Sequence, residues 1–184
     1  MSLSKEELAV FSNAVYKKKS LRYINKNIDG DWILDKRRSK ADSKVFINEE
    51  DKIIVIAFRG TSNLKDVIDD ISIITSREHK NKRWQKARKL VQKVNSKYYD
   101  YKVYVVGHSL GGSLAEFASR HTGNETVAFS RGNLKIEQDI KNDNLTDVYN
   151  KYDPISLLVG THKGNKKREV EVDGLNKHSI KSFV

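Results

Sequence analysis

The sequence contains no cysteine, a single proline and no long apolar run. Without cysteine the protein has no disulfide bond, no thiolate metal site and no cysteine nucleophile. No segment approaches the ~20 apolar residues of a membrane-spanning helix. The first residues, Met1 to Leu8, lack the apolar core of a signal peptide. We therefore expect a soluble protein that is cytoplasmic or is released by a non-signal route.

Acidic residues are outnumbered by basic ones. The sequence contains 35 Lys and Arg and 24 Asp and Glu, which gives a net charge of +11. The excess is local. The segment from Arg77 to Lys97 has nine basic residues and one acidic residue, Glu78. A solvated face explains such a run, and so does attraction to an anionic surface of lipid headgroups or nucleic acid. Charge alone does not decide between these alternatives.

Apolar segments recur along the chain with helical or strand-like patterns. Ser4 and Glu7 have the spacing of a capping box, which predicts a helix through Tyr16. A second helix is predicted over Arg83 to Ser96. The predicted strands are Ile53 to Phe58, which is apolar throughout, Tyr101 to Val106, Thr126 to Phe129, Val148-Tyr149 and Val170 to Val172. This alternation predicts one α/β domain over residues 1–184, with a mainly parallel central sheet flanked by helices and with N-terminal helix and hairpin elements over about 1–40.

The strongest chemical motif is Gly107-His108-Ser109-Leu110-Gly111-Gly112, between a predicted strand and a helix predicted over Ser113 to His121. In that setting G-x-S-x-G predicts a nucleophile elbow, a sharp turn that presents Ser109 above the end of the sheet. Side chains at Gly107 and Gly111 would crowd the turn. The positive end of the following helix favours a developing oxyanion. The alternative is a glycine-rich turn with an idle serine.

Acyl transfer also requires hydrogen-bond donors for the oxyanion of the tetrahedral intermediate. One donor is expected from the backbone N–H of Leu110, the residue after the nucleophile. The second should come from the loop Phe58-Arg59-Gly60-Thr61-Ser62, which follows the apolar strand. We assign it to Thr61, through its N–H and its hydroxyl. The alternative is an ordinary turn at the end of a strand.

A base and an acid should complete a catalytic triad in the chain order Ser, acid, His. His178 is the preferred base because it follows a predicted late strand, whereas His162 lies in a basic loop. Asp153 is the preferred acid because it follows a strand and precedes Pro154, which stiffens the loop. Asp139, Asp143 and Asp147 are alternative acids that we expect on the solvated surface. His79 and His108 precede the serine, and His121 ends the helix after the elbow, facing away from the site.

Together these motifs resemble the class 3 lipase family over about residues 40 to 184. Its signature blocks are similar to Phe58-Arg59-Gly60-Thr61-Ser62, Val105 to Gly112, Asp153-Pro154-Ile155 and His178-Ser179-Ile180. The segment Leu64 to Ile71 is similar to the part of that family that bears the lid. The resemblance implies a single-domain α/β-hydrolase (lipase-like) fold and hydrolysis of acylglycerols or phospholipids through an acyl-enzyme. It implies triad roles for Ser109, Asp153 and His178 and oxyanion roles for Thr61 and Leu110. No compact cluster of ligand residues stands out in the sequence, so we expect no metal or cofactor.

Two other functions stay open from the sequence. One is a small soluble esterase or thioesterase, and the other is a non-catalytic module that binds lipid or nucleic acid through its basic face. Exposed aromatic side chains beside the charge would favour nucleic acid, and Trp84, Tyr98 and Tyr99 lie near the basic segment. The combined Ser, Asp and His favour the lipid-ester hydrolase, and the basic surface favours an anionic membrane as its peripheral partner. The sequence does not indicate an oligomeric state.

Overall fold

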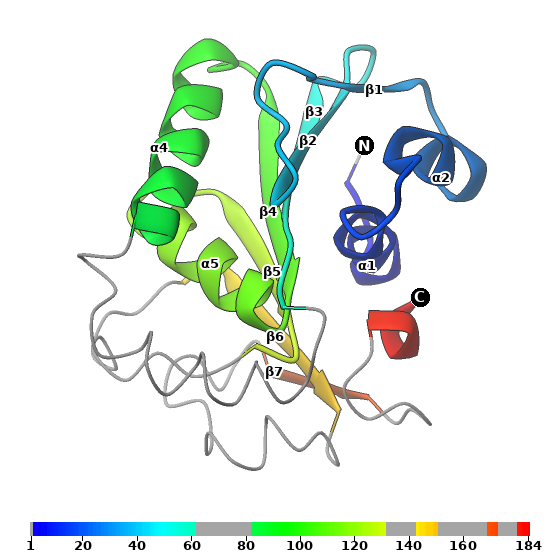
Figure 1. Ribbon diagram of the computed structural model, residues 1–184, viewed down its shortest axis with the longest axis vertical. Coiled ribbons are helices and arrows are strands. Elements are labelled where there is room, and N and C mark those ends of the chain that lie inside the picture. Colours follow the sequence, from blue (N-terminus) through cyan, green and yellow to red (C-terminus); the bar gives the residue numbers. More distant parts are fainter. Residues whose placement is uncertain (1, 62–81, 132–142, 151–168, 173–179) are drawn as a thin grey trace.

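A seven-stranded sheet forms the centre of the protein (Figure 1). The structure is a computed structural model and describes residues 2–61, 82–131, 143–150, 169–172 and 180–184. The strands follow one another across the sheet in chain order, with β1 to β3 antiparallel and β3 to β7 parallel. Their bounds are β1 (Trp32–Leu34), β2 (Ser43–Asn48), β3 (Ile53–Phe58), β4 (Lys102–His108), β5 (Glu125–Phe129), β6 (Leu145–Asn150) and β7 (Glu169–Val172). The predicted, mainly parallel central sheet is confirmed.

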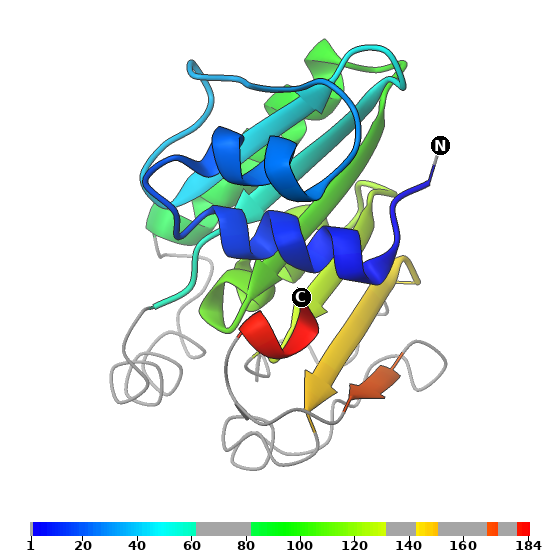
Figure 2. The same ribbon diagram turned by 90° about the vertical axis from the view of Figure 1, so that its right-hand side faces the viewer.

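Helices cover both faces of this sheet. One face carries α1 (Lys5–Ala14), α2 (Ser20–Asn27) and the short 3₁₀ helix η4 (Ile180–Phe183), which lie together in front of the strands in Figure 2. The other face carries α4 (Lys82–Lys97) and α5 (Leu110–Ser119) (Figure 1). The predicted fold class, an α/β sandwich with helices on both faces, is therefore confirmed. No helix in the described ranges combines the length and the apolar character needed to cross a bilayer.

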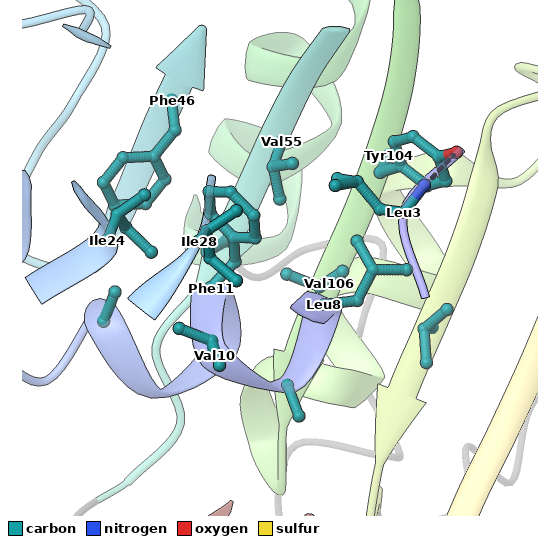
Figure 3. Packing of buried hydrophobic residues seen from close by; sticks show 14 of the residues in the cluster. Leu3, Leu8, Val10, Phe11, Ile24, Ile28, Phe46, Val55, Tyr104 and Val106 are labelled. Atoms are coloured by element: carbon teal, nitrogen blue, oxygen red, sulfur yellow. Dashed lines mark hydrogen bonds between the residues drawn. The ribbon is translucent and has the colours of Figure 1, made fainter. Parts of the chain in front are cut away.

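The first helix begins and packs as its sequence predicts. The Ser4 hydroxyl accepts from the Glu7 N–H at 3.1 Å, and the Glu7 carboxylate accepts from the Ser4 N–H at 2.7 Å. Phe11 then packs edge-on against Trp32, with 4.6 Å between ring centroids, and also against Phe46. Figure 3 shows Phe11 and Phe46 among the apolar side chains gathered between α1 and the sheet. The helix ends at Ala14, two residues before the predicted end.

Strand β3 shows why the sheet needs two helical layers. All six of its side chains are buried. Because successive side chains of a strand point to opposite faces, Val55 and Ala57 join the apolar cluster under α1, whereas Ile56 and Phe58 join the cluster under α4 and α5. The prediction that this apolar run is covered on both faces is confirmed.

Three element predictions were incomplete or wrong. Helix α5 begins at Leu110, three residues earlier than predicted, because its glycines lie within the first helical turn. Strand β6 is longer than the two residues predicted for it. Helix α2 was not predicted at all, because only Ser20 and Ile24 of its eight residues are buried and its sequence is largely polar.

Candidate active site

The strand-to-helix turn at Ser109 has the geometry of a nucleophile elbow. Ser109 lies between the end of β4 and the start of α5, with φ 57° and ψ −129°. A non-glycine residue in such a conformation stores about 1–3 kcal/mol of strain, which surrounding contacts must offset. The Ser109 N–H donates to the Phe129 carbonyl at 2.9 Å, and the Ser109 carbonyl accepts from the Gly112 N–H at 2.9 Å. The predicted turn and its strain are therefore present at the predicted residue.

Close backbone packing holds the elbow in place. A Cβ atom added to Gly107 would lie 2.7 Å from the Gly112 nitrogen, and one added to Gly111 would lie 2.8 Å from the Gly60 nitrogen. Real Cβ contacts are not that short, so both positions require glycine, as predicted. The contact between Gly111 and Gly60 brings the start of α5 against the loop that carries Thr61. Ser109, Leu110 and the Thr61 loop therefore lie at one end of the sheet.

Two side chains from distant segments anchor the loop that carries Thr61. The Gly60 N–H donates to the Tyr16 hydroxyl at 2.9 Å, and Tyr16 directly follows the first helix. The Arg83 Nη2 atom, in the first turn of α4, donates to the Arg59 carbonyl at 2.6 Å. The Arg59 guanidinium lies 5.4 Å from the centre of the Tyr16 ring. The loop is thus held from both helical layers, which fixes the backbone that is expected to bind the oxyanion.

The surroundings of the Tyr16 hydroxyl make it harder to ionise. Burial raises the pKa of Tyr16 above its ordinary value, and the smaller opposing effects come from the Gly60 N–H and the guanidinium groups of Arg59 and Arg83. Sequence reasoning did not find Tyr16 or Arg83 as part of the site. Neither belongs to a motif, and Tyr16 is 44 residues from the Gly60 N–H that it accepts.

A buried ionic network lies behind the elbow helix. Arg131 forms a two-pronged ion pair with Asp147, in which Nη2 lies 2.7 Å from Oδ2, and its Nη1 donates to Glu116 at 2.7 Å. Arg120 Nη2 donates to the other Glu116 oxygen at 3.1 Å. The network joins α5 to β6 and to the residues after β5. The expectation that Asp147 lies on the solvated surface was wrong, because its partner Arg131 stabilises the buried carboxylate.

The structure describes only part of the predicted site. Ser109, Leu110 and Thr61 are described and come from adjacent segments. Asp153, His178 and the alternatives His162 and Asp139 lie outside the described residues. Asp143 is exposed, and His121 is exposed at the far end of α5, as expected.

The family of the chain follows from a comparison with protein-family models. A model described as phospholipase-like, the Tle-like phospholipase domain, matches residues 7–150. The chain belongs to this Tle-like phospholipase family. The matched residues include the Thr61 loop, the elbow and β6, whereas Asp153 and His178 lie beyond them. A search of curated proteins gives no significant match.

Solved structures of lipases have the same fold as this Tle-like phospholipase domain. The Lip2 lipase of Yarrowia lipolytica is 17% identical with a TM-score of 0.59, over 92% of this chain and 77% of that one. A mutant form of MDLA from Penicillium cyclopium is 14% identical with a TM-score of 0.55, over 98% and 86%. The Rhizomucor miehei lipase in its propeptide complex is 14% identical with a TM-score of 0.52, over 82% and 60%.

These comparisons confirm two predictions from the sequence. The predicted lipase-like α/β-hydrolase fold is confirmed by the structural neighbours. The prediction of a lipid-ester hydrolase of the lipase and phospholipase class is confirmed by the Tle-like phospholipase family. The roles of individual residues are not tested by either comparison.

Proposed function

We propose that this protein hydrolyses the carboxylic-ester bonds of phospholipids or acylglycerols, with Ser109 as the nucleophile. One observation carries the proposal. Ser109 has a strained, positive-φ backbone between a central parallel strand and a buried helix, against the Gly60 loop. A serine held in this way has the position that acyl transfer requires, next to backbone N–H groups suited to an oxyanion.

The proposed reaction passes through an acyl-enzyme. His178 takes the proton of the Ser109 hydroxyl as its oxygen attacks the ester carbonyl carbon, and Asp153 holds the imidazole in the required tautomer. The N–H groups of Leu110 and Thr61 stabilise the oxyanion. The intermediate collapses, the ester C–O bond breaks, and the alcohol leaves with the proton from His178. Water, deprotonated by His178, then attacks the acyl carbon and releases the carboxylic acid and free Ser109.

The topology supports Asp153 and His178 as the triad partners. Asp153 follows β6 by three residues, and His178 follows β7 by six residues and precedes η4 by two. Strands β4, β6 and β7 are parallel, so their carboxyl ends lie at the same edge of the sheet as Ser109. We also propose that residues 1–184 form one domain, because Phe183, near the C-terminus, packs against Phe129 with 5.4 Å between ring centroids.

The first test compares the wild type with Ser109→Ala on p-nitrophenyl esters of short and long chain, then on phosphatidylcholine and phosphatidylglycerol vesicles. Loss of the nucleophile should lower turnover by roughly 10⁴- to 10⁶-fold. Ser12→Ala is a matched control, since Ser12 is fully buried and its hydroxyl has no hydrogen-bond partner among the described residues. Equal rates in wild type and Ser109→Ala, or no hydrolysis of any ester, would overturn the proposal.

The same assay tests the triad and the substrate class. Asp153→Asn and His178→Ala should each lower turnover by about 10⁴-fold or more. Asp143→Asn, at the exposed alternative acid, should leave turnover unchanged. Hydrolysis restricted to short soluble esters would instead indicate the small esterase or thioesterase.

A further inference from the structure

The outward face of α4 is a continuous ridge of lysines. Its members are all exposed and occur at intervals of four, three, four and four residues: Lys82, Lys86, Lys89, Lys93 and Lys97. Such spacing keeps side chains on one stripe of a helix, about 22 Å long at 1.5 Å per residue. The sixteen residues of the helix include no acidic side chain. We call these five residues the lysine ridge.

The described part of the chain forms no ion pair with the lysine ridge, although Lys97 interacts electrostatically with Asp35. Within the part of the chain that the structure describes, none of the five lysines forms an ion pair, and Lys97 donates instead to the Tyr98 hydroxyl at 3.0 Å. The two arginines of α4 make contacts within the protein: Arg83 donates to the Arg59 carbonyl, and Arg88 lies 4.1 Å from the centre of the Phe117 ring. Lysines therefore supply the charge of the outer stripe, although like charges at these spacings repel.

The lysine ridge begins beside the candidate active site. Lys82 precedes Arg83, whose side chain contacts the loop that carries Thr61. Asp100 lies just beyond the other end of α4 and forms an ion pair at 2.6 Å with Lys52, the residue before β3. The far end of α4 therefore lies near the start of β3. The ridge thus extends along the outer helical layer from the active-site end of the sheet to the opposite end (Figure 1).

We propose that the lysine ridge binds the anionic surface of a phospholipid bilayer and so holds the enzyme at its substrate. This inference rests on the proposed function, since the substrate of the site would lie in that surface. Lysine ammonium groups are compact point charges suited to a diffuse layer of phosphates, and each contributes roughly a fivefold gain in affinity near an anionic bilayer. Nucleic acid is disfavoured because α4 offers no exposed aromatic side chain for stacking: its Trp84 is 1% exposed.

The test is vesicle co-sedimentation of the full chain carrying Ser109→Ala, so that the lipid is not consumed. The triple change Lys86→Gln, Lys89→Gln and Lys93→Gln should lower partitioning onto phosphatidylglycerol vesicles on the order of 100-fold. The matched control changes three exposed lysines on the α1 and α2 side, Lys18→Gln, Lys19→Gln and Lys26→Gln. It removes the same net charge and should reduce partitioning less than threefold. Replacing the three ridge lysines by arginine should preserve binding.

Several outcomes would overturn the inference. These are equal losses in the ridge and control variants, an unchanged partitioning of the ridge variant, or an equal loss on phosphatidylcholine vesicles. Ridge-dependent binding of duplex DNA that is tighter than vesicle binding at the same salt concentration would assign the surface to nucleic acid. Circular dichroism verifies that each variant is folded. Failure of the proposed function is seen separately, because it would leave hydrolysis of p-nitrophenyl esters insensitive to Ser109→Ala while vesicle binding remained measurable.

Discussion

Helices α4 and α5 pack on the same face of the sheet, yet they are built in opposite ways. All ten residues of α5 are buried, whereas only four of the sixteen residues of α4 are buried: Trp84, Ala87, Val91 and Val94. The two helices meet where Phe117 of α5 contacts the Trp84 ring, at 5.1 Å between centroids. A helix that is buried on every side is held firmly enough to keep a strained turn at its start. A helix that is buried on one side can carry charged residues on its exposed side. The difference suits α5 to the proposed chemistry and α4 to the proposed contact with a membrane surface.

Outside the proposed triad, the largest expected effect comes from loosening the start of α5. Gly111→Ala would push a methyl group against the Gly60 backbone and displace the elbow from the loop that carries Thr61. We expect at least a 10²–10³-fold loss of turnover, the size of effect seen when an oxyanion donor is lost. Gly123→Ala is the matched control because no atom lies within 4 Å of its added Cβ. It should cost only the strain of its positive φ, about 1–2 kcal/mol in stability, with turnover retained. Equal activity in the two variants would contradict the close-packing account.

The next largest effect should follow from breaking the ionic network that fixes α5. Arg131→Met would leave the Glu116 and Asp147 carboxylates buried without their main partner. We expect the free energy of unfolding in urea to fall by about 3–5 kcal/mol. Lys52→Met breaks the exposed pair with Asp100 and should leave stability unchanged within error. Similar effects in both variants would mean that burial does not distinguish the two ion pairs.

A smaller effect is expected from changes at the two side chains that anchor the loop carrying Thr61. Tyr16→Phe leaves the Gly60 N–H without its acceptor, which costs about 1–3 kcal/mol and should lower kcat roughly tenfold. Arg83→Met tests the matching contact from α4 and should act in the same direction.

The pH dependence of stability distinguishes the contribution of Tyr16 from that of Arg83. Because the folded pKa of Tyr16 is raised, its stabilising contribution is complete below the unfolded pKa near 10 and is lost as pH rises through the folded value. Thermal unfolding at pH 8 and pH 11 should therefore show a smaller alkaline loss in Tyr16→Phe than in the wild type. An identical alkaline loss in both proteins would exclude Tyr16 as its source.

The smallest effect is expected on the outer side of α4. The triple change at Lys86, Lys89 and Lys93 relieves repulsion between neighbours on the lysine ridge, at about 0.2–0.5 kcal/mol per pair. Because the change removes four such pairs, stability at low salt should rise by about 1–2 kcal/mol, and the gain should shrink in high salt. The control changes at Lys18, Lys19 and Lys26 should give a smaller gain. A fall in stability would mean that the ridge lysines contribute to packing.

Much of this protein was predictable from local patterns in its sequence. The capping box at Ser4, the apolar run of β3, the amphipathic α4 and the elbow at Ser109 each depend on residues within a few positions of one another. Strand and helix periodicity then sufficed for the α/β class. The nucleophile and both oxyanion positions were predicted from the same local motifs, and the described elbow geometry fits them. Asp153 and His178 stay predictions.

The nucleic-acid alternative illustrates what local patterns do not reveal. Trp84 and Tyr98 lie beside the basic segment in sequence, but Trp84 is fully buried and Tyr98 packs partly against the core. Only Tyr99, at 87% exposed, has the exposure that base stacking requires. The exposure of a side chain depends on which face of the helix packs against the sheet. The presence of aromatic residues near the basic segment therefore did not predict which of them are exposed.

What the sequence determined by itself was most of the helices and strands, the strained serine turn and the glycines that it requires, because each of these depends on local backbone conformation. Tertiary structure alone decided that Tyr16 and Arg83 hold the loop that carries Thr61 and that Asp147 is buried against Arg131. These contacts join residues 44, 24 and 16 positions apart. They form only when folding has brought distant segments together and removed water from between them, and no local pattern records which partners will then meet.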